Sequence, residues 1–513
     1  MKSNQTFKSA GIVSVLTMLS RITGLFRDMC MACLFGTEGV MSAFVIAYRI
    51  PNLFRALFGE GALSAAFVPV FTETLKKDGP ECAFLFASRA LSIIFVILSV
   101  IAGVGIIIIT FCKLLGIPNE ESLLIWRLTQ ILLPYMVFIC SAALLAAILN
   151  SLGKFALPAS TQLVYNMTIV LLAFFLLKAK KDQEPAIVMI AWGSLFAVSL
   201  QFIMQLPPLI KRGFRLGASI DFKDPYILKA GSLMSISAIG MGASRINALV
   251  DTLLAKLISE SAPSYLYFAD RLIYLPLGIF ATALGTVLLP AFSTYASANE
   301  PDKIRSSLGF YLRNISFLMI PSAIGLIALA KPIISSIFQT RNFTSSSTNG
   351  TALALICYST LLIFTGLTKV FVPGFYALQD MKTPLKIGLC STILNLMLSV
   401  TLMFPFKYAG IASATVIAAI ANAIMLAIAL HKRLGSPGWS DIISGMVRQL
   451  LAGIVMGYIA YITNRFAIDV FPGSIPMKLA GILALLLAII VGATIYILLA
   501  LLLGATEPRE LLG

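Results

Sequence analysis

Arginine residues occur within stretches that are otherwise apolar enough to be membrane-embedded helices. They are Arg21, Arg27, Arg49, Arg55, Arg245 and Arg271. An arginine at the centre of a membrane helix costs roughly 2.5–3.5 kcal/mol, whereas a leucine contributes about −0.5 kcal/mol. Such helices are tolerated only if their charged faces line a water-filled cavity or bind an anion. The six arginines therefore predict that this chain handles a negatively charged molecule within the bilayer.

The chemistry of the guanidinium group narrows the choice of anion. It is planar, always charged, and binds phosphate oxygens two at a time, so several arginines at one site suit a diphosphate. The alternative is internal pairing with the neighbouring acids Asp28, Glu60 and Asp270. Adjacent residues on a helix point in different directions, so these acids are not expected to neutralise every arginine. We therefore favour an anion-binding cavity that these acids support.

Fewer acidic and polar side chains lie within the apolar stretches. Asp251 lies deep in one of them, and Asn395 and Ser399 share a helix face because they are four residues apart. Oxygen ligands of this kind can hold Na⁺ or relay a proton, which makes these three residues a candidate ion site. The alternative is that Asp251 pairs with Arg245 or Lys256.

No catalytic or metal-binding motif is predicted. The sequence contains no phosphate-binding P-loop, no H-E-x-x-H motif, and no non-membrane stretch longer than about 20 residues. Cys30 and Cys33 form a C-x-x-C, but they lie in an apolar helix with no further ligands nearby. We expect a transporter without a cofactor, driven by Na⁺, by H⁺ or by the membrane potential.

The composition indicates a membrane protein. Hydrophobic residues make up 59% of the 513 residues and charged residues only 12%, whereas a soluble protein has about a quarter charged residues. The net charge of +16 is attributed to basic loops that face anionic lipid, and no nucleic-acid partner is expected.

Apolar stretches separated by polar or Pro/Gly breaks predict about fourteen helices. Their ranges are 8–35, 38–75, 83–112, 122–149, 157–178, 186–208, 226–258, 265–297, 307–331, 350–378, 384–404, 409–432, 442–465 and 476–504. The second and eighth are long and contain prolines, which predicts kinked helices that line a cavity. An even number places both termini on one side, and the loop distribution of Lys and Arg places that side in the cytoplasm.

Three pairs of short motifs recur in the same order. Ser20-Arg21-Ile22 recurs as Ser244-Arg245-Ile246, Ala47-x-Arg49-Ile50 as Ala269-x-Arg271-Leu272, and Pro69-x-Phe71 as Pro290-x-Phe292. The offset is about 221–224 residues in every case. This distance spans six predicted helices, so the two copies have the same orientation in the membrane.

The repeat predicts an all-α polytopic protein with two six-helix lobes related by a pseudo-two-fold axis. The N-lobe covers 1–215, the C-lobe 223–435, and a C-terminal helix pair 440–513. This architecture is typical of transporters in which two lobes rock around a central site. In that arrangement Arg21 lies opposite Arg245, and Arg49 lies opposite Arg271.

Several motifs resemble those of a known family. They are Ser20-Arg21-Ile22-x-Gly24-x-x-Arg27-Asp28, Pro51-Asn52-Leu53-x-Arg55, Glu60-Gly61-Ala62, Ala66-Phe67-Val68-Pro69, Ala269-Asp270-Arg271-Leu272 and Pro373-Gly374-Phe375-Tyr376. With them the chain resembles the MurJ/MviN lipid II flippases of the multidrug/oligosaccharidyl-lipid/polysaccharide exporter superfamily. The resemblance implies fourteen helices, two lobes, and a C-terminal pair that forms a groove for a polyprenyl tail. It implies functional roles for Arg21, Arg27, Arg55 and Arg271, with Ser264 as a cavity residue.

Two positions depart from the pattern of that family. Met41-Ser42 stands where the family often has Thr-Asp, and Tyr274 replaces a frequent acid. A proton relay through acids at these positions is therefore not expected in this chain.

The resemblance implies a flippase for the undecaprenyl-diphosphate-linked peptidoglycan precursor in the bacterial inner membrane. Its partners would be membrane lipids and the proteins of cell wall synthesis and division. One alternative is a flippase for another polyprenyl-diphosphate-linked glycan. A drug/cation antiporter of the same superfamily is disfavoured, because it would need acids where this chain has arginines.

Overall fold

The computed structural model describes residues 2–55, 62–217, 220–278, 282–470 and 476–508. Within these ranges the chain forms α-helices joined by short connections and no β-strand. The prediction of an all-α protein is therefore confirmed. The chain divides into two compact units, residues 1–253 and 254–513, and each is described by itself.

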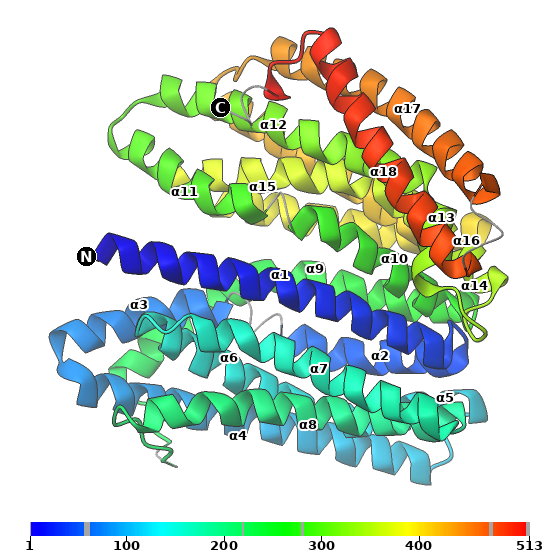
Figure 1. The fold of residues 1–513 in the computed structure, drawn as a ribbon. Helices are drawn as coiled ribbons and strands as arrows, with labels where there is room; N and C mark the ends of the chain where they lie inside the picture. The colour runs from blue at the N-terminus through cyan, green and yellow to red at the C-terminus, as the bar shows by residue number, and fades with distance from the viewer. Residues whose placement is uncertain (1, 56–61, 218–219, 279–281, 471–475, 509–513) are drawn as a thin grey trace. The chain divides into compact units, whose positions relative to one another are not determined.

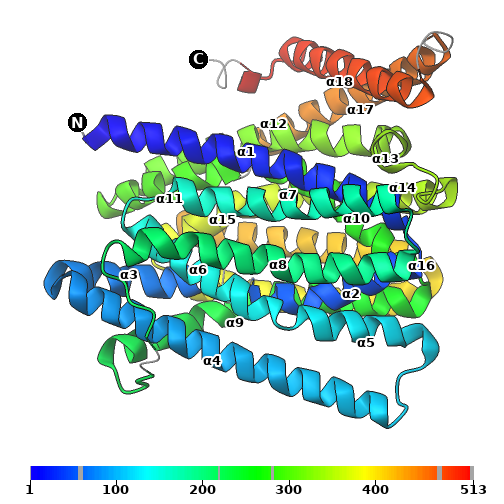
Figure 2. The ribbon, with the colours of Figure 1, turned by 60° about the horizontal axis from the view of Figure 1, so that its bottom comes forward.

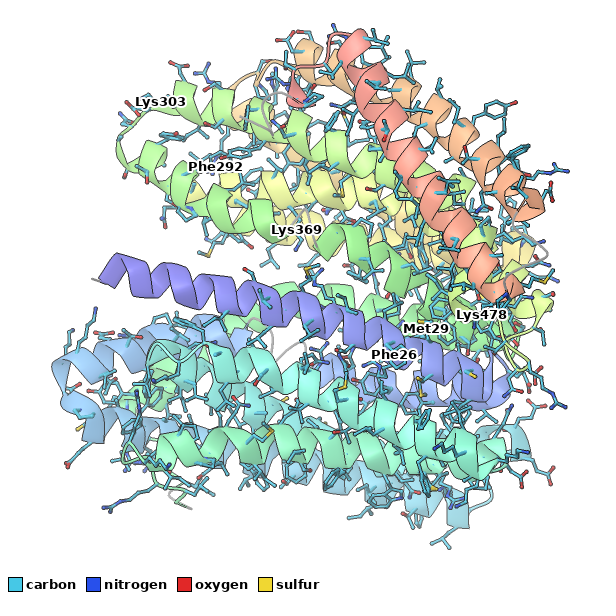
Figure 3. All side chains as sticks on the ribbon, in the orientation of Figure 1. Phe26, Met29, Phe292, Lys303, Lys369 and Lys478 are labelled. Atoms are coloured by element: carbon cyan, nitrogen blue, oxygen red, sulfur yellow. The ribbon has the colours of Figure 1, made fainter. Side chains whose placement is uncertain are left out.

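Nine helices in the described part of the chain are long and apolar enough to cross a membrane. Many large apolar side chains on the helices are exposed, as is expected of surfaces that contact lipid (Figure 3). The protein is thus a multi-pass membrane protein. The count of fourteen crossings stays a prediction.

The first unit consists of α1 to α8 and most of α9. Their bounds are α1 Lys2–Phe35, α2 Gly39–Phe54, α3 Ala62–Lys77, α4 Gly79–Leu114, α5 Glu120–Leu132, α6 Tyr135–Ser151, α7 Ala156–Ala179, α8 Gln183–Ile210 and α9 Pro225–Ile258. Helix α7 lies between α1 and α8, and α6 packs against α8 (Figures 1 and 2). These contacts place the polar residues of α1 next to those of α7.

Aromatic side chains pack the end of the first unit where α3 and α4 meet. The rings of Phe67 and Phe86 stack with their centroids 5.0 Å apart, and Phe84 meets Phe214 at 6.3 Å. All four side chains are buried. This cluster fixes α3 against α4 and against the segment that follows α8.

Helix α9 begins within the first unit. Lys229 of α9 forms an ion pair with Glu73 of α3 at 2.6 Å, and Arg89 of α4 pairs with Asp224 just before α9. Packing thus groups α9 as far as residue 253 with the first unit. The repeat, by contrast, assigns 223–435 to the C-lobe, and this sequence-based boundary stays a prediction.

The second unit contains α10 to α18. Their bounds are α10 Ala262–Pro276, α11 Thr282–Ser297, α12 Pro301–Ala328, α13 Ala330–Phe338, α14 Ser345–Ser359, α15 Leu361–Ala377, α16 Lys382–Leu434, α17 Trp439–Val470 and α18 Met477–Leu502. The predicted ranges 122–149 and 350–378 are each divided in two, into α5 with α6 and α14 with α15. Pro134 lies at the first of these divisions, where its missing N–H interrupts the helix.

Helix α16 is an antiparallel pair that reverses at Lys407. Lys407 has φ 52°, and Gly410 lies so close to Leu402 that a Cβ there would be 2.0 Å from the Leu402 carbonyl oxygen. Asn395 donates to Thr415 Oγ1 across the pair at 3.2 Å. The break predicted between 404 and 409 lies at this turn.

The two C-terminal helices pack on α12. Gly453 and Gly457 of α17 face Ile324, which leaves no space for a larger side chain at either position. Tyr496 of α18 donates to the carbonyl oxygen of Phe317 at 2.9 Å. The helix pair is therefore anchored by close packing and by a buried hydrogen bond.

Candidate functional site

Arg27 of α1 is held by side chains from two helices. Its Nη2 lies 2.7 Å from Asp28 Oδ1, its Nη1 donates to Asn166 Oδ1 at 3.1 Å, and its guanidinium lies 5.8 Å from the ring centre of Tyr165. Asp28 is only 2% exposed. The adjacent acid does pair with this arginine, so the alternative of internal pairing applies to Arg27.

Asn166 of α7 ties the two helices together. Its Nδ2 donates to the Ser20 carbonyl oxygen at 2.8 Å and to Thr23 Oγ1 at 3.3 Å, while its Oδ1 accepts from Arg27. Asn166 is 1% exposed, so it is a fully buried interhelical hydrogen-bonding residue. The guanidinium of Arg27 is therefore held in a fixed orientation.

Tyr165, which contacts Arg27, belongs to a cluster of tyrosine side chains. The Tyr48 and Tyr135 hydroxyls lie 3.1 Å apart, and the rings of Tyr135 and Tyr165 meet edge to face at 6.3 Å. These residues come from α2, α6 and α7. The sequence reasoning missed this cluster, because nothing in the spacing of the tyrosines indicates that they meet.

The other predicted site arginines of the first unit lie on α1, α2 and α9, with Arg55 directly after α2. Arg49 Nε donates to Thr252 Oγ1 at 3.0 Å, which links α2 to α9. Arg55 Nε donates to Asn52 Oδ1 at 2.8 Å. Arg21 and Arg245 are half-buried on α1 and α9. The placement of Arg21 and Arg245 on opposite sides of one cavity stays a prediction.

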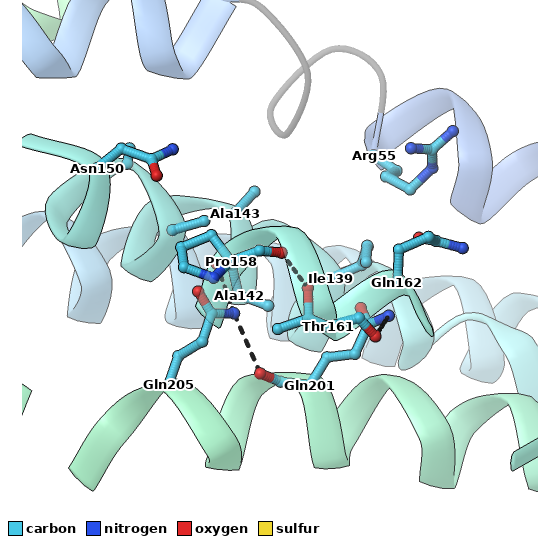
Figure 4. A pocket seen from close by; sticks show the side chains of 12 residues that line it. Arg55, Ile139, Ala142, Ala143, Asn150, Pro158, Thr161, Gln162, Gln201 and Gln205 are labelled. Carbon is cyan, nitrogen blue, oxygen red and sulfur yellow. Dashed lines mark hydrogen bonds between the residues drawn. The ribbon is translucent and has the colours of Figure 1, made fainter. Parts of the chain in front are cut away.

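A cavity of about 300 Å³ lies within the first unit, among α2, α6, α7 and α8 (Figure 4). Its polar lining consists of Arg55, Asn150, Thr161, Gln162, Gln201 and Gln205. Gln201 Nε2 donates to the Thr161 carbonyl oxygen at 2.9 Å, which joins α8 to α7. The cavity itself was not predicted from the sequence.

In the second unit, Arg271, Asp270 and Ser264 all lie on α10. The guanidinium of Arg271 lies 4.8 Å from the ring centre of Tyr267 and donates to its hydroxyl at 3.3 Å. Ser264 is fully buried. Tyr274, one turn after Arg271, is 51% exposed. Glu60, the remaining supporting acid, lies outside the described residues.

The candidate ion-site residues are divided between the two units. Asp251 of α9 is buried at 8% exposure in the first unit. Asn395 and Ser399 lie in the second, where Ser399 Oγ donates to Asn395 Oδ1 at 3.4 Å. Lys256 pairs with Glu260 at 3.8 Å. Among the described residues no group of three His, Cys, Asp or Glu side chains could hold a metal ion.

Lys369 is a further basic residue that the sequence reasoning missed. It is exposed near the middle of the apolar helix α15 (Figure 3). The criterion applied to the arginines, a charge within an apolar helix, would have identified it.

The chain as a whole is similar to proteins of a known family. The family model described as "Lipid II flippase MurJ" matches residues 31–481. The chain belongs to the MurJ lipid II flippase family. Members of this family are transporters and not enzymes, which agrees with the prediction from the sequence.

Individual relatives support the assignment to the MurJ family. The chain is 35% identical over 441 residues to a probable lipid II flippase MurJ of Vibrio cholerae. The match covers 84% of this chain and 83% of the relative. A solved structure of a lipid II flippase MurJ in an inward closed conformation is 27% identical, with a TM-score of 0.79. That match covers 98% of this chain and 99% of the other.

The fold is also shared with a more distant group. An inward-facing multidrug resistance MATE family transporter of the MOP superfamily matches with a TM-score of 0.69 at 13% identity, over 83% of this chain and 98% of that one. At this identity the likeness concerns the fold alone.

Proposed function

We propose that this protein is a lipid II flippase. It moves the undecaprenyl-diphosphate-linked peptidoglycan precursor from the inner to the outer leaflet of the bacterial cytoplasmic membrane, with both of its own termini in the cytoplasm. Membership of the MurJ family over residues 31–481 is the observation that carries this proposal. The half-buried arginines support it, because arginine is the side chain suited to a diphosphate.

The mechanism is alternating access between two lobes. The arginines Arg21, Arg27, Arg49, Arg55, Arg245 and Arg271 provide the positive charge that offsets dehydration of the headgroup. At an effective dielectric constant near 20, one charge pair at about 4 Å contributes roughly 4 kcal/mol. Asp28 competes with the substrate for Arg27, to which it is bound at 2.7 Å. This competition lowers affinity and so permits release on the far side.

The driving force is the membrane potential, Na⁺ or H⁺. An inside-negative membrane potential of about 100 mV favours the export of each negative charge by roughly 2.3 kcal/mol. The candidate ligands for a coupling ion are Asp251, Asn395 and Ser399.

Membrane lipids surround the protein, and proteins of cell wall synthesis and division are its proposed partners because they use the exported precursor.

The test is depletion of the protein in its own cells, with lipid II measured separately in the two leaflets. We expect lipid II to accumulate in the cytoplasmic leaflet and to fall in the outer leaflet. Unchanged outward exposure would remove the flippase proposal. A parallel assay in proteoliposomes compares lipid II with another polyprenyl-diphosphate-linked glycan, and faster transport of the latter would favour the alternative substrate.

A further inference from the structure

The cavity within the first unit, which we call the amide pocket, has an unusual lining for a membrane protein. Carboxamides come from three helices: Asn150 of α6, Gln162 of α7, and Gln201 and Gln205 of α8. Four alanines of α6 and Pro158 contribute to the apolar part of the lining (Figure 4). None of the lining residues is acidic. Such a lining suits a ligand that both donates and accepts hydrogen bonds and also has an apolar face.

One atom of the amide pocket defines what the ligand must offer. Gln205 is 1% exposed, and its Nε2 donates to the carbonyl oxygens of Ala142 and Gln201 at 3.2 and 3.1 Å. These two acceptors fix the amide so that Oε1 is the remaining polar atom. Oε1 is buried and has no hydrogen-bond partner among the described residues. A buried carbonyl without a hydrogen-bond donor is unfavourable, so a ligand that donates a hydrogen bond to it gains affinity here.

This preference disfavours the diphosphate as the group that lies beside Gln205. An ionised diphosphate only accepts hydrogen bonds, whereas Gln205 Oε1 needs a donor. Sugar hydroxyls and N-acyl N–H groups are donors. Arg55, the only charged residue of the lining, can contact a phosphate attached to such a sugar. The volume of about 300 Å³ is at the lower end for small-molecule sites, which fits one ring rather than an extended glycan.

We propose that the amide pocket is a glycan subsite that binds one hydroxylated, N-acylated sugar ring of the transported headgroup. This inference rests on the proposed function, because it takes the cargo to be a polyprenyl-diphosphate-linked glycan. The carboxamides of Gln162, Gln201 and Gln205 bond the hydroxyl and amide groups, while the alanines of α6 contact the apolar face of the ring. The pocket thereby distinguishes loaded carrier lipid from the bare diphosphate.

The test measures lipid binding to the full-length protein in nanodiscs. The probes are undecaprenyl diphosphate without sugar and the same lipid with one N-acetylated sugar. Ala143→Leu fills the pocket from α6, and Gln162→Met removes one carboxamide at an exposed position of its lining. We expect either variant to weaken binding of the sugar-bearing lipid about tenfold, which corresponds to about 1.4 kcal/mol. Binding of the bare lipid should stay unchanged, which also shows that the variants are folded.

Ala179→Leu is the matched control, because Ala179 is an exposed residue of α7 that does not line the pocket. It should bind both lipids like the wild type. Equal weakening for both lipids, or no weakening in either pocket variant, would overturn the glycan subsite and leave the flippase proposal standing. If the wild-type protein neither binds nor transports the sugar-bearing lipid, the proposed function fails, and the glycan subsite fails with it.

Discussion

Arg27 shows how a charge is maintained inside an apolar helix. It contacts an acid on its own helix, an amide on α7 and the face of an aromatic ring. Each of these contacts uses a different property of the guanidinium: its charge, its directional N–H groups and its planar face. A lysine has the positive charge, but it has neither the fixed set of N–H donors nor the planar face of a guanidinium group. The contacts therefore specify arginine and not merely a positive residue.

Arg27→Lys is predicted to lose function almost as completely as Arg27→Ala. We expect translocation in proteoliposomes to fall by at least about tenfold, because one ammonium cannot contact Asp28 and Asn166 in the same geometry. The measurements are translocation in proteoliposomes and rescue of cells depleted of the wild-type protein, with membrane levels checked by immunoblot. Arg212→Lys, at an exposed loop position, is the control and should rescue. Full rescue by Arg27→Lys would show that charge alone is sufficient.

Asp28→Asn tests whether the acid moderates substrate affinity. Asparagine has the same shape but no charge, so Arg27 would keep a hydrogen-bond acceptor and lose its neutralising partner. We expect binding of undecaprenyl diphosphate to tighten by about tenfold and transport to slow, because tighter ground-state binding hinders release. Equilibrium binding and single-turnover translocation measure the two effects. Weaker binding in this variant would show that Asp28 mainly orients Arg27.

At the scale of elements, the turn in α16 depends on close backbone contact. Both halves are apolar helices, and side-chain hydrogen bonds such as Ser391 to the Ala418 carbonyl oxygen join them at 2.8 Å. The approach of Gly410 to the Leu402 carbonyl oxygen sets how tightly the chain reverses.

Gly410→Ala is predicted to destabilise the protein. The added Cβ would lie 2.0 Å from a backbone oxygen, which must then move, at a cost of about 1–3 kcal/mol. Gly388→Ala in the same helix is the control, because a Cβ there meets nothing within 4 Å. The thermal unfolding midpoint in detergent should fall for the first variant and stay level or rise for the second. Equal midpoints would contradict the tight turn.

The connection between α15 and α16 is predicted to make stability sensitive to acid. Hydrogen bonds from Thr383, assisted by the charge of Arg433 2.7 Å away, lower the pKa of Asp380 below its ordinary value of 3.8. Because the folded state has the lower pKa, this stabilisation is present above pH 3.8 and is lost as the pH falls through the folded pKa. Asp380→Asn should therefore flatten the acid limb of a plot of unfolding midpoint against pH. Thr383→Val should do so in part, and an unchanged acid limb in both variants would contradict the assignment.

At the scale of the whole molecule, sequence patterns predicted what depends on periodicity and composition. They predicted an all-α chain, the α16 break between 404 and 409, and arginines on otherwise apolar helices. They did not predict the contact of Asn166 with three residues of α1, the amide pocket, or the packing of α9 on α3. These features depend on which helix faces meet, and apolar stretches that are uniformly hydrophobic do not specify their facing sides.

The direction of transport is predicted to follow the membrane potential. A membrane potential of about 100 mV, inside negative, favours export of a headgroup with two negative charges by about 4.6 kcal/mol, twice the value of about 2.3 kcal/mol for one charge. Proteoliposomes with a potassium diffusion potential of that sign should export lipid II faster than vesicles at zero potential. Replacing Na⁺ in the buffer and collapsing the pH gradient separately identify any ion coupling. Equal rates with and without the potential would exclude it as the driving force.

The reversal at Lys407 also bears on how the chain enters the membrane during synthesis. Residues 382–434 form a nearly continuous apolar stretch of 53 residues, more than a bilayer needs for two crossings. The exposed Lys407, two residues after Pro405, marks where this stretch divides. The two halves can then leave the translocon together as a hairpin. The orientation of α17 and α18, which are made after this hairpin, therefore depends on a turn of a few residues.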